Sequence, residues 1–132
     1  MKYLITGGLG FIGHNVVRML EDLGHKCFVV DTSTNYGFIP ASEITYLTDL
    51  RRKRIKSEVY KFDIRDETLI NGLVLNQEID CIIHLASFPR QKVVEQNPLL
   101  ASDVMANGLI NLLVTARKYC SKFVYVLSLI HI

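Results

Sequence analysis

Four glycines lie in one short segment near the amino terminus, Thr6 to Gly13, which reads TGGLGFIG. The segment fits G-x-x-G-x-x-G through Gly7, Gly10 and Gly13. It also fits G-x-G-x-x-G if the motif begins at Gly8, and spacing alone does not choose between them. Glycines so spaced permit a sharp turn, close approach of the backbone to a pyrophosphate, and tight packing of a helix on a strand. Because the amides and dipole of a following helix attract phosphates, the segment predicts a phosphate-binding loop.

Two further features narrow the ligand class. A P-loop for nucleoside triphosphates needs Lys and then Ser or Thr after its last glycine, whereas His14 and Asn15 follow Gly13. Asp31 stands 18 positions after Gly13, at the end of the next apolar run. A carboxylate at that place accepts hydrogen bonds from an adenosine ribose and repels a 2′-phosphate. The pattern indicates a dinucleotide site and favours NAD over NADP.

The apolar pattern places these residues on alternating strands and helices. Short continuous apolar runs predict strands at residues 2–6, 26–31, 59–62, 81–86 and 123–126. Spacings of three to four, with capping signals, predict helices at 11–23, about 41–56, after Asp66, and from Pro98 to about 119. Alternation of this kind implies a parallel sheet covered by helices on both faces, with right-handed crossovers.

Composition bounds the class of protein. The 132 residues, 49% of them apolar and 21% charged, suffice for one globular domain with a core. No run of about 18 uncharged apolar residues is present to cross a bilayer. The apolar segment before Gly7 is too short for an export signal, so we expect a cytoplasmic protein with no membrane partner. Cys27, Cys81 and Cys120 have the spacing of neither a metal knuckle nor a redox pair, so we expect buried thiols and no metal site.

A dense basic run, from Arg51 to Lys56, is the strongest local charge feature. A formal net charge of +2 is too small to argue for nucleic acid, and no aromatic stacking platform accompanies the run. We therefore interpret the run as a solvated face and expect no nucleic-acid partner. An RNA-binding role is the alternative, which salt-sensitive retention on RNA would support.

Further motifs carry a resemblance to a known family. They are Asp63-Ile64-Arg65-Asp66, His84-Leu85-Ala86-Ser87, Asn97-Pro98, Gly108 with Asn111-Leu112-Leu113, and Phe123-Val124-Tyr125-Val126. With the glycine segment and Asp31, they make the chain similar to the extended short-chain dehydrogenases, specifically the NAD-dependent nucleotide-sugar epimerases and dehydratases. The resemblance implies an α/β fold, a Rossmann-type doubly wound parallel sheet of five strands with flanking helices. It also implies that residues 1–126 are an incomplete NAD-binding domain.

The resemblance assigns the cofactor-binding residues. It implies that the loop contacts the pyrophosphate, that Asp31 contacts the ribose, that Asp63 and Ile64 border the adenine, and that the segment after the fourth strand lies along the nicotinamide. The residues concerned are Gly7, Gly10, Phe11, Ile12, Gly13, Asp31, Asp63, Ile64, Leu85, Ala86 and Ser87. Two positions depart from the family: Met105 and Thr32 stand where it has Asn, and Asn107 does not inherit the role. Ser33 or Thr34 can still reach the ribose.

Two histidines and one loop need separate interpretation. His84 lies inside an apolar strand and matches the family's structural histidine, so we expect no catalytic role. His14, near the helix start, is expected to face solvent or lie loosely near phosphate. After the fourth strand, Arg90 or Lys92 could meet sugar-nucleotide phosphates, and a solvated loop is the equal alternative.

The resemblance also implies an activity for the complete protein. Relatives such as UDP-glucose 4-epimerases oxidise a sugar hydroxyl with NAD and return the hydride, using a Tyr-x-x-x-Lys pair. None of the six tyrosines here has Lys four residues later, so we expect this fragment to bind NAD, to contain no catalytic residue and to be inactive. A non-catalytic dinucleotide sensor or scaffold of the same fold is the alternative. Expected partners of the complete protein are a nucleotide sugar and a second copy, through the helix after Pro98.

The last six residues depart from the pattern of relatives, which have a Ser-Ser pair after the fifth strand. Residues 127–132 can be encoded by CTG TCT CTT ATA CAC ATC, which resembles a transposon-end adapter used in sequencing libraries. We therefore expect 127–132 to be a non-native tail. We also expect the fifth strand to lie at an open edge of the sheet, which favours aggregation.

Overall fold

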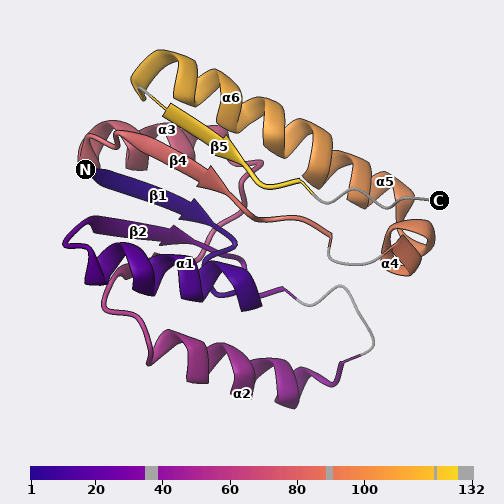
Figure 1. Cartoon of the computed structure of the whole chain (residues 1–132). Coiled ribbons are helices and arrows are strands. Elements are labelled where there is room, and N and C mark those ends of the chain that lie inside the picture. The colour runs from indigo at the N-terminus through magenta and orange to yellow at the C-terminus, as the bar shows by residue number, and fades with distance from the viewer. Residues whose placement is uncertain (35–38, 89–90, 121, 128–132) are drawn as a thin grey trace.

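The structure is a computed structural model that describes residues 1–34, 39–88, 91–120 and 122–127. A parallel sheet of five strands runs through it in the order β3-β2-β1-β4-β5 (Figure 1). The strands are β1 (Lys2–Thr6), β2 (Lys26–Val30), β3 (Glu58–Tyr60), β4 (Cys81–His84) and β5 (Lys122–Tyr125). Because β1 pairs with both β2 and β4, the chain reverses its direction across the sheet at β1. In open α/β sheets, ligands bind at this reversal, beyond the carboxyl ends of the strands.

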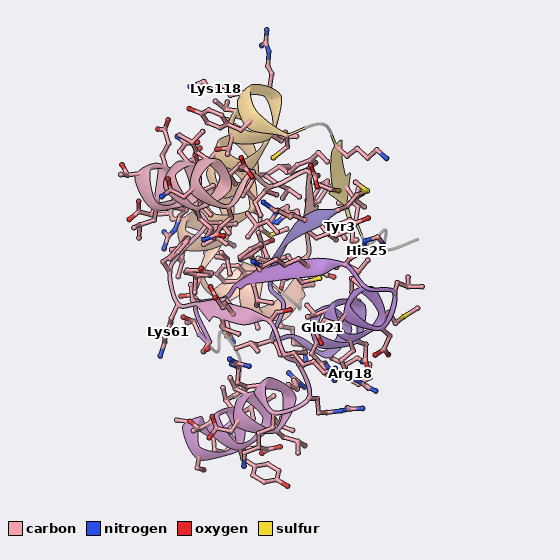
Figure 2. All side chains as sticks on the ribbon, turned by 90° about the vertical axis from the view of Figure 1, so that its left-hand side faces the viewer. Tyr3, Arg18, Glu21, His25, Lys61 and Lys118 are labelled. Carbon is pink, nitrogen blue, oxygen red and sulfur yellow. The ribbon has the colours of Figure 1, made fainter. Side chains whose placement is uncertain are left out.

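Helices cover both faces of this sheet. In Figure 1, α1 (Phe11–Asp22) and α2 (Ala41–Arg52) lie on one side, and α3 (Glu67–Gln77) and α6 (Gly108–Tyr119) lie on the other. Three shorter elements lead into α6: α4 (Gln91–Gln96), α5 (Pro98–Ser102) and the π-helix η1 (Asp103–Asn107). The α2 helix has no buried residue and lies farther from the sheet than α1 in both views (Figures 1 and 2).

Two apolar clusters hold the layers together, one on each face. Alternate side chains of a strand point to opposite faces, so Leu4 joins the cluster under α3 and α6 while its neighbour Ile5 joins the cluster under α1. Leu112 of α6 and Val17 of α1 are fully buried in these two clusters. The expected two-faced parallel sheet is therefore confirmed.

Several element boundaries differ from the sequence prediction. Strand β4 ends at His84 rather than at residue 86, because the Thr6 side chain, not a strand partner, accepts from the amide of Ala86. Helix α2 ends at Arg52 rather than near 56, because Ile55 turns inward and is buried in the second cluster. Helix α4 was not predicted, and η1 interrupts the long helix expected from Pro98.

The stretch Pro98–Tyr119 meets the length and composition criteria for a membrane-crossing helix. The sequence prediction, which required about 18 uncharged apolar residues in a row, found no such stretch. In the fold, its buried residues Val104, Leu112 and Ala116 belong to the first cluster. This stretch therefore serves as a covering helix of the sheet.

The cysteines and the tail complete the description. Cys27 and Cys81 are buried as expected, whereas Cys120 is only half-buried. Burial raises the pKa of the Cys27 and Cys120 thiols to about 11, so both stay protonated at neutral pH. Among the described residues, no cluster of metal-ligating side chains is present. Of the expected non-native tail, 127–132, all but Leu127 lies outside the described residues.

Candidate functional site

A cavity of about 410 Å³ opens beyond the carboxyl ends of β1, β2 and β4, at the reversal of the sheet. Its wall combines the glycine loop, the segment after β2, one side of α2, the turn after β3, the turn after β4, and parts of α4 and η1. Its lining residues are Gly7, Leu9, Gly10, Phe11, Val30, Asp31, Thr32, Ser33, Thr34, Ile39, Ile44, Thr48, Arg51, Phe62, Asp63, Ile64, Ala86, Ser87, Val93 and Val104. Its volume lies in the usual range of small-molecule sites.

The glycine loop needs glycine where the backbone turns and where α1 meets it. Gly7 has φ +71°, and a Cβ there would lie 2.8 Å from the backbone nitrogen of Ala86. A Cβ on Gly13 would collide with the carbonyl oxygen of Gly7. A Cβ on Gly8 would lie 2.6 Å from the Val29 side chain, so Gly8 is also required, for packing on β2. The loop therefore needs glycine at both Gly7 and Gly8, because it packs against the turn after β4 at the first and against β2 at the second.

The start of α1 supplies free donors beside this loop. Gly10 is the N-cap residue, and no side chain caps the helix there. The amides of the first turn, from Phe11 to Gly13, therefore have no capping oxygen. Phe11 lines the cavity, so the positive end of the helix dipole borders it. An anion at this point would replace the missing cap.

Asp31 follows β2 and is held in a fixed orientation. Its Oδ2 accepts from the amide of Leu9 at 2.9 Å, and its Oδ1 accepts from the amide of Ser33 at 2.8 Å. Ser33 has φ +56°, a left-handed conformation that is uncommon for a residue other than glycine. Each carboxylate oxygen keeps a further acceptor site, so Asp31 can still accept hydrogen bonds from ligand hydroxyls.

Two arginines of the basic run hold the glycine loop from outside. The Arg51 guanidinium donates to the carbonyl of Leu9 at 3.1 Å and lines the cavity. Arg54 donates to Nε2 of His14 at 3.2 Å, and Nδ1 of His14 donates to the carbonyl of Gly10 at 2.9 Å. A guanidinium can only donate and a carbonyl can only accept, so the His14 proton is on Nδ1. Arg52, Lys53, Arg54 and Lys56 are exposed, as expected of a solvated basic face, whereas Arg51 is half-buried against the loop.

His14 itself is a correction. It is 2% exposed, not solvent-facing, and its ring connects the basic run to the loop. The α1 periodicity places residue 14 on the buried face with Val17, a signal that the polar residue type obscured.

The turn after β3 forms the apolar end of the cavity. Phe62 and Ile64 lie on its wall beside Val93 and Val104, and Asp63 is the acidic group among them. The Arg65 guanidinium hydrogen-bonds both oxygens of Asp63, at 3.0 and 2.8 Å. This contact holds the pKa of the Asp63 carboxyl below its usual value, so the group is ionised at neutral pH.

The turn after β4 is stabilised by a buried hydrogen-bond network. The Thr6 Oγ1 accepts from the amides of Leu85 and Ala86, so its own proton goes to Nδ1 of His84, 2.7 Å away. Burial lowers the pKa of His84 to about 4, so the ring is neutral and stacks on Tyr125 with ring centroids 5.3 Å apart. The structural role expected for His84 agrees with this geometry.

Known proteins share the sequence pattern of this chain. Residues 4–128 match the family model for GDP-mannose 4,6 dehydratase. The chain belongs to that family. The UDP-glucose 4-epimerase 2 of Oryza sativa subsp. japonica is 29% identical over 123 residues, which cover 92% of this chain and 30% of that protein. The resemblance to the NAD-dependent epimerases and dehydratases is thereby confirmed.

Solved structures agree. The UDP-glucose-4-epimerase (galE) of Stenotrophomonas maltophila, solved with bound NAD and formylated UDP-arabinopyranose, superposes with a TM-score of 0.77 and 26% identity. The match covers 95% of this chain and 36% of that one. The UDP-glucose 4-epimerase of Bifidobacterium longum, in complex with NAD+ and UDP, gives a TM-score of 0.76 and 25% identity over 97% of this chain and 37% of that one. This member of the dehydratase family thus spans about a third of the length of its relatives.

The site residues expected from the family resemblance divide into two groups. Eight lie on the cavity wall: Gly7, Gly10, Phe11, Asp31, Asp63, Ile64, Ala86 and Ser87. The other three do not line it: Ile12 is exposed, Gly13 packs on the loop, and Leu85 packs against the second cluster. Arg90 lies outside the described residues, and Lys92 is exposed on α4.

Other wall residues were missed by sequence reasoning. Met105 packs against the first cluster instead of lining the cavity, and its neighbour Val104 lies on the wall. Arg51 and Thr48 come from α2, whose weak periodicity gave no sign that it borders a ligand.

Proposed function

We propose that the cavity binds NAD and that the chain is the cofactor-binding part of a nucleotide-sugar epimerase or dehydratase similar to UDP-glucose 4-epimerase. The observation that supports this best is the joint position of the uncapped start of α1 and the fixed carboxylate of Asp31 on one cavity wall. The first suits a pyrophosphate and the second suits a ribose. Relatives solved with NAD have the same fold.

The loop fits the pyrophosphate because its backbone is open toward the cavity. A Cβ built on Gly10 meets only the carbonyl oxygen of Gly7, at 3.1 Å, and otherwise open space. A phosphate can therefore contact the backbone there, next to the amides of Phe11 and Ile12. In this arrangement Ile12 contributes its amide, which explains why its side chain is not part of the wall.

The two sides of the cavity separate ribose from base. Asp31 and the hydroxyls of Ser33 and Thr34 suit the ribose hydroxyls, and Asp31 disfavours a 2′-phosphate. The apolar surface of Ile64 and Val104 suits the faces of an adenine ring, whose amino group can donate to the ionised Asp63. Ala86 and Ser87 remain for the nicotinamide side.

When bound, NAD supplies the acceptor and donor of a hydride. The residues of this chain bind and orient the dinucleotide, and none of its tyrosines has the lysine that would make it a base. We therefore assign binding without turnover to this chain, and turnover to the complete protein. A dinucleotide sensor of the same fold is distinguished by a complete coding sequence that lacks Tyr-x-x-x-Lys.

The complete protein is proposed to act on a nucleotide sugar and to form a homodimer through the stretch Pro98–Tyr119. Support for the dimer comes from the outward side of this stretch, where Leu99, Ile110, Leu113 and Val114 are exposed apolar residues. Solvent-exposed apolar surface of this extent is typical of an interface.

Calorimetric titration with NAD tests the proposal. We expect binding by the wild-type chain, and loss of at least about 100-fold in affinity for Gly10→Val, whose side chain would occupy the phosphate position. Gly72→Ala is the matched control, because a Cβ at Gly72 in α3 meets nothing within 4 Å. Absence of binding to wild type, or equal binding by Gly10→Val, would refute the proposal.

A further inference from the structure

We propose that Arg65 is a positioning residue that gives the cavity its preference for a base with a 6-amino group, by holding the Asp63 carboxylate between the cavity and η1. The inference rests on the proposed function, because it concerns the adenine end of the same dinucleotide site. It goes further in assigning base selectivity to a residue that does not line the cavity.

The first step is the two-pronged contact between Arg65 and Asp63. Nε donates to Oδ1 at 3.0 Å, Nη2 donates to Oδ2 at 2.8 Å, and the backbone amide of Arg65 adds a third bond to Oδ1 at 2.9 Å. Such a planar fork fixes the rotation of the carboxylate group as well as its position. The Arg65 and Asp63 side chains are both partly exposed. As a pair they could still move relative to the cavity unless a third residue anchors them.

The second step is the anchor. The third guanidinium nitrogen, Nη1, contacts Oδ2 of Asp103 at 2.6 Å, and Oδ1 of Asp103 accepts from the Asn107 side chain at 2.7 Å. Asp103 and Asn107 are the first and last residues of η1. The π-helix therefore holds Arg65 from the helix side while its own Val104 faces the cavity.

Two further contacts tie the same turn to α6, which follows η1 directly. The Asn111 amide group donates to the carbonyl of Ile64 at 2.6 Å. A Cβ on Gly108 would lie 2.5 Å from Ile64 Cδ1, so this glycine admits the Ile64 side chain against the helix. The turn is thus held at Ile64 and at Arg65, the two residues after Asp63, which leaves the carboxylate little freedom.

The third step is chemical. An ionised carboxylate only accepts hydrogen bonds, so it favours the 6-amino group of adenine and opposes the 6-oxo group of hypoxanthine, which also accepts. A carboxylate that can rotate loses part of this distinction, because it no longer presents a fixed acceptor to the edge of the base. By keeping Asp63 oriented, Arg65 acts on the choice between the bases more than on the rest of the dinucleotide.

The experiment compares NAD with nicotinamide hypoxanthine dinucleotide, its 6-oxo analogue, by calorimetry on the wild-type chain and on Arg65→Met and Arg65→Lys. We expect wild type to prefer NAD by about tenfold or more, the worth of one hydrogen bond to a charged group. Arg65→Met should reduce the preference to about twofold. Arg65→Lys, which keeps the charge but not the fork, should fall between, and it replaces the methionine variant if that variant fails to fold.

Lys61→Met is the matched control. Lys61 is a neighbouring cation that extends away from the protein (Figure 2), so its loss should leave the preference unchanged. The inference is overturned if Arg65→Met weakens both ligands equally, if Lys61→Met reduces the preference as much, or if wild type binds both ligands equally well. In the last case the proposed function still stands, whereas failure of wild type to bind NAD at all overturns the proposed function and this inference with it.

Discussion

Replacing Gly7 by alanine tests why the loop has glycine at this position. The reason is either the close contact with the turn after β4 or only the positive φ. Gly7 and Gly24 both have positive φ, +71° and +81°, so alanine at either position is strained. The strain of a left-handed conformation costs about 1 kcal/mol for alanine. At Gly24, which follows the end of α1, the added Cβ meets nothing within 4 Å, so this cost is all we expect.

At Gly7 the same Cβ would lie 2.8 to 2.9 Å from three backbone atoms, the nitrogen and Cα of Ala86 and the carbonyl carbon of Leu85. These atoms cannot retreat easily, because the amides of both residues are bonded to Thr6. Forced overlap in a packed interior costs about 1 to 3 kcal/mol. We therefore expect Gly7→Ala to lose about 3 kcal/mol of unfolding free energy, and Gly24→Ala about 1 kcal/mol.

Urea denaturation of the two variants and wild type measures these losses, since the linear extrapolation gives each free energy of unfolding. Equal losses, within about 0.5 kcal/mol, would show that the contact with the turn after β4 costs nothing and would refute the steric argument. Calorimetry adds a second measurement. Gly7→Ala should also weaken NAD binding, because Ala86 lies on the cavity wall, whereas Gly24→Ala should not.

Three other predictions concern different parts of the fold. The pKa of His84 falls from 6.5 to about 4 on burial, so the unfolded chain takes up the proton first. Stability is therefore complete above about pH 6.5 and declines by up to about 3 kcal/mol as the pH falls to 4, a slope that His84→Asn should reduce in urea titrations. Asp66 accepts from the Leu69 amide at 3.0 Å as N-cap of α3, so Asp66→Ala should cost about 1 kcal/mol in the same assay, and no loss would contradict the capping role. In the complete protein, for which we propose a homodimer, Ile110→Asp should give a monomer in light scattering, whereas Leu75→Asp, at a similarly exposed position on α3, should leave the dimer intact.

The three central strands, β1, β2 and β4, were predictable because each combines a short apolar run with burial on both faces. Leu4 and Ile5 of β1 pack into opposite clusters, so both had to be apolar, and the run of such residues identifies the strand. The capping role of Asp66 was equally visible, because carboxylates favour that position at a helix start. Local signals of this kind are stored in a few adjacent residues.

The remaining features depend on contacts between distant segments, which adjacent residues do not encode. Arg51 borders the cavity only because α2 runs back beside the glycine loop, 42 positions earlier in the chain. His14 had a polar type and a buried position, and its partner Arg54 lies 40 positions away. Patterning therefore predicted which elements form, whereas their tertiary contacts determine which side chains meet the ligand.

The hydrogen bonds from Arg54 through His14 to Gly10 determine the direction of the Phe11 amide at the start of α1. The carbonyl of Gly10 accepts from both the amide and the ring of His14, at 3.2 and 2.9 Å, and therefore points along α1. In a planar trans peptide the N–H lies opposite the C=O, so the Phe11 amide points out of the helix start, toward the cavity. Arg54 donates to the other nitrogen of the His14 ring and holds that ring in place. These contacts orient the Phe11 amide, a hydrogen-bond donor for a phosphate, in the absence of a ligand. In the proposed NAD complex, Arg54 would therefore act on the pyrophosphate through the orientation of the loop backbone.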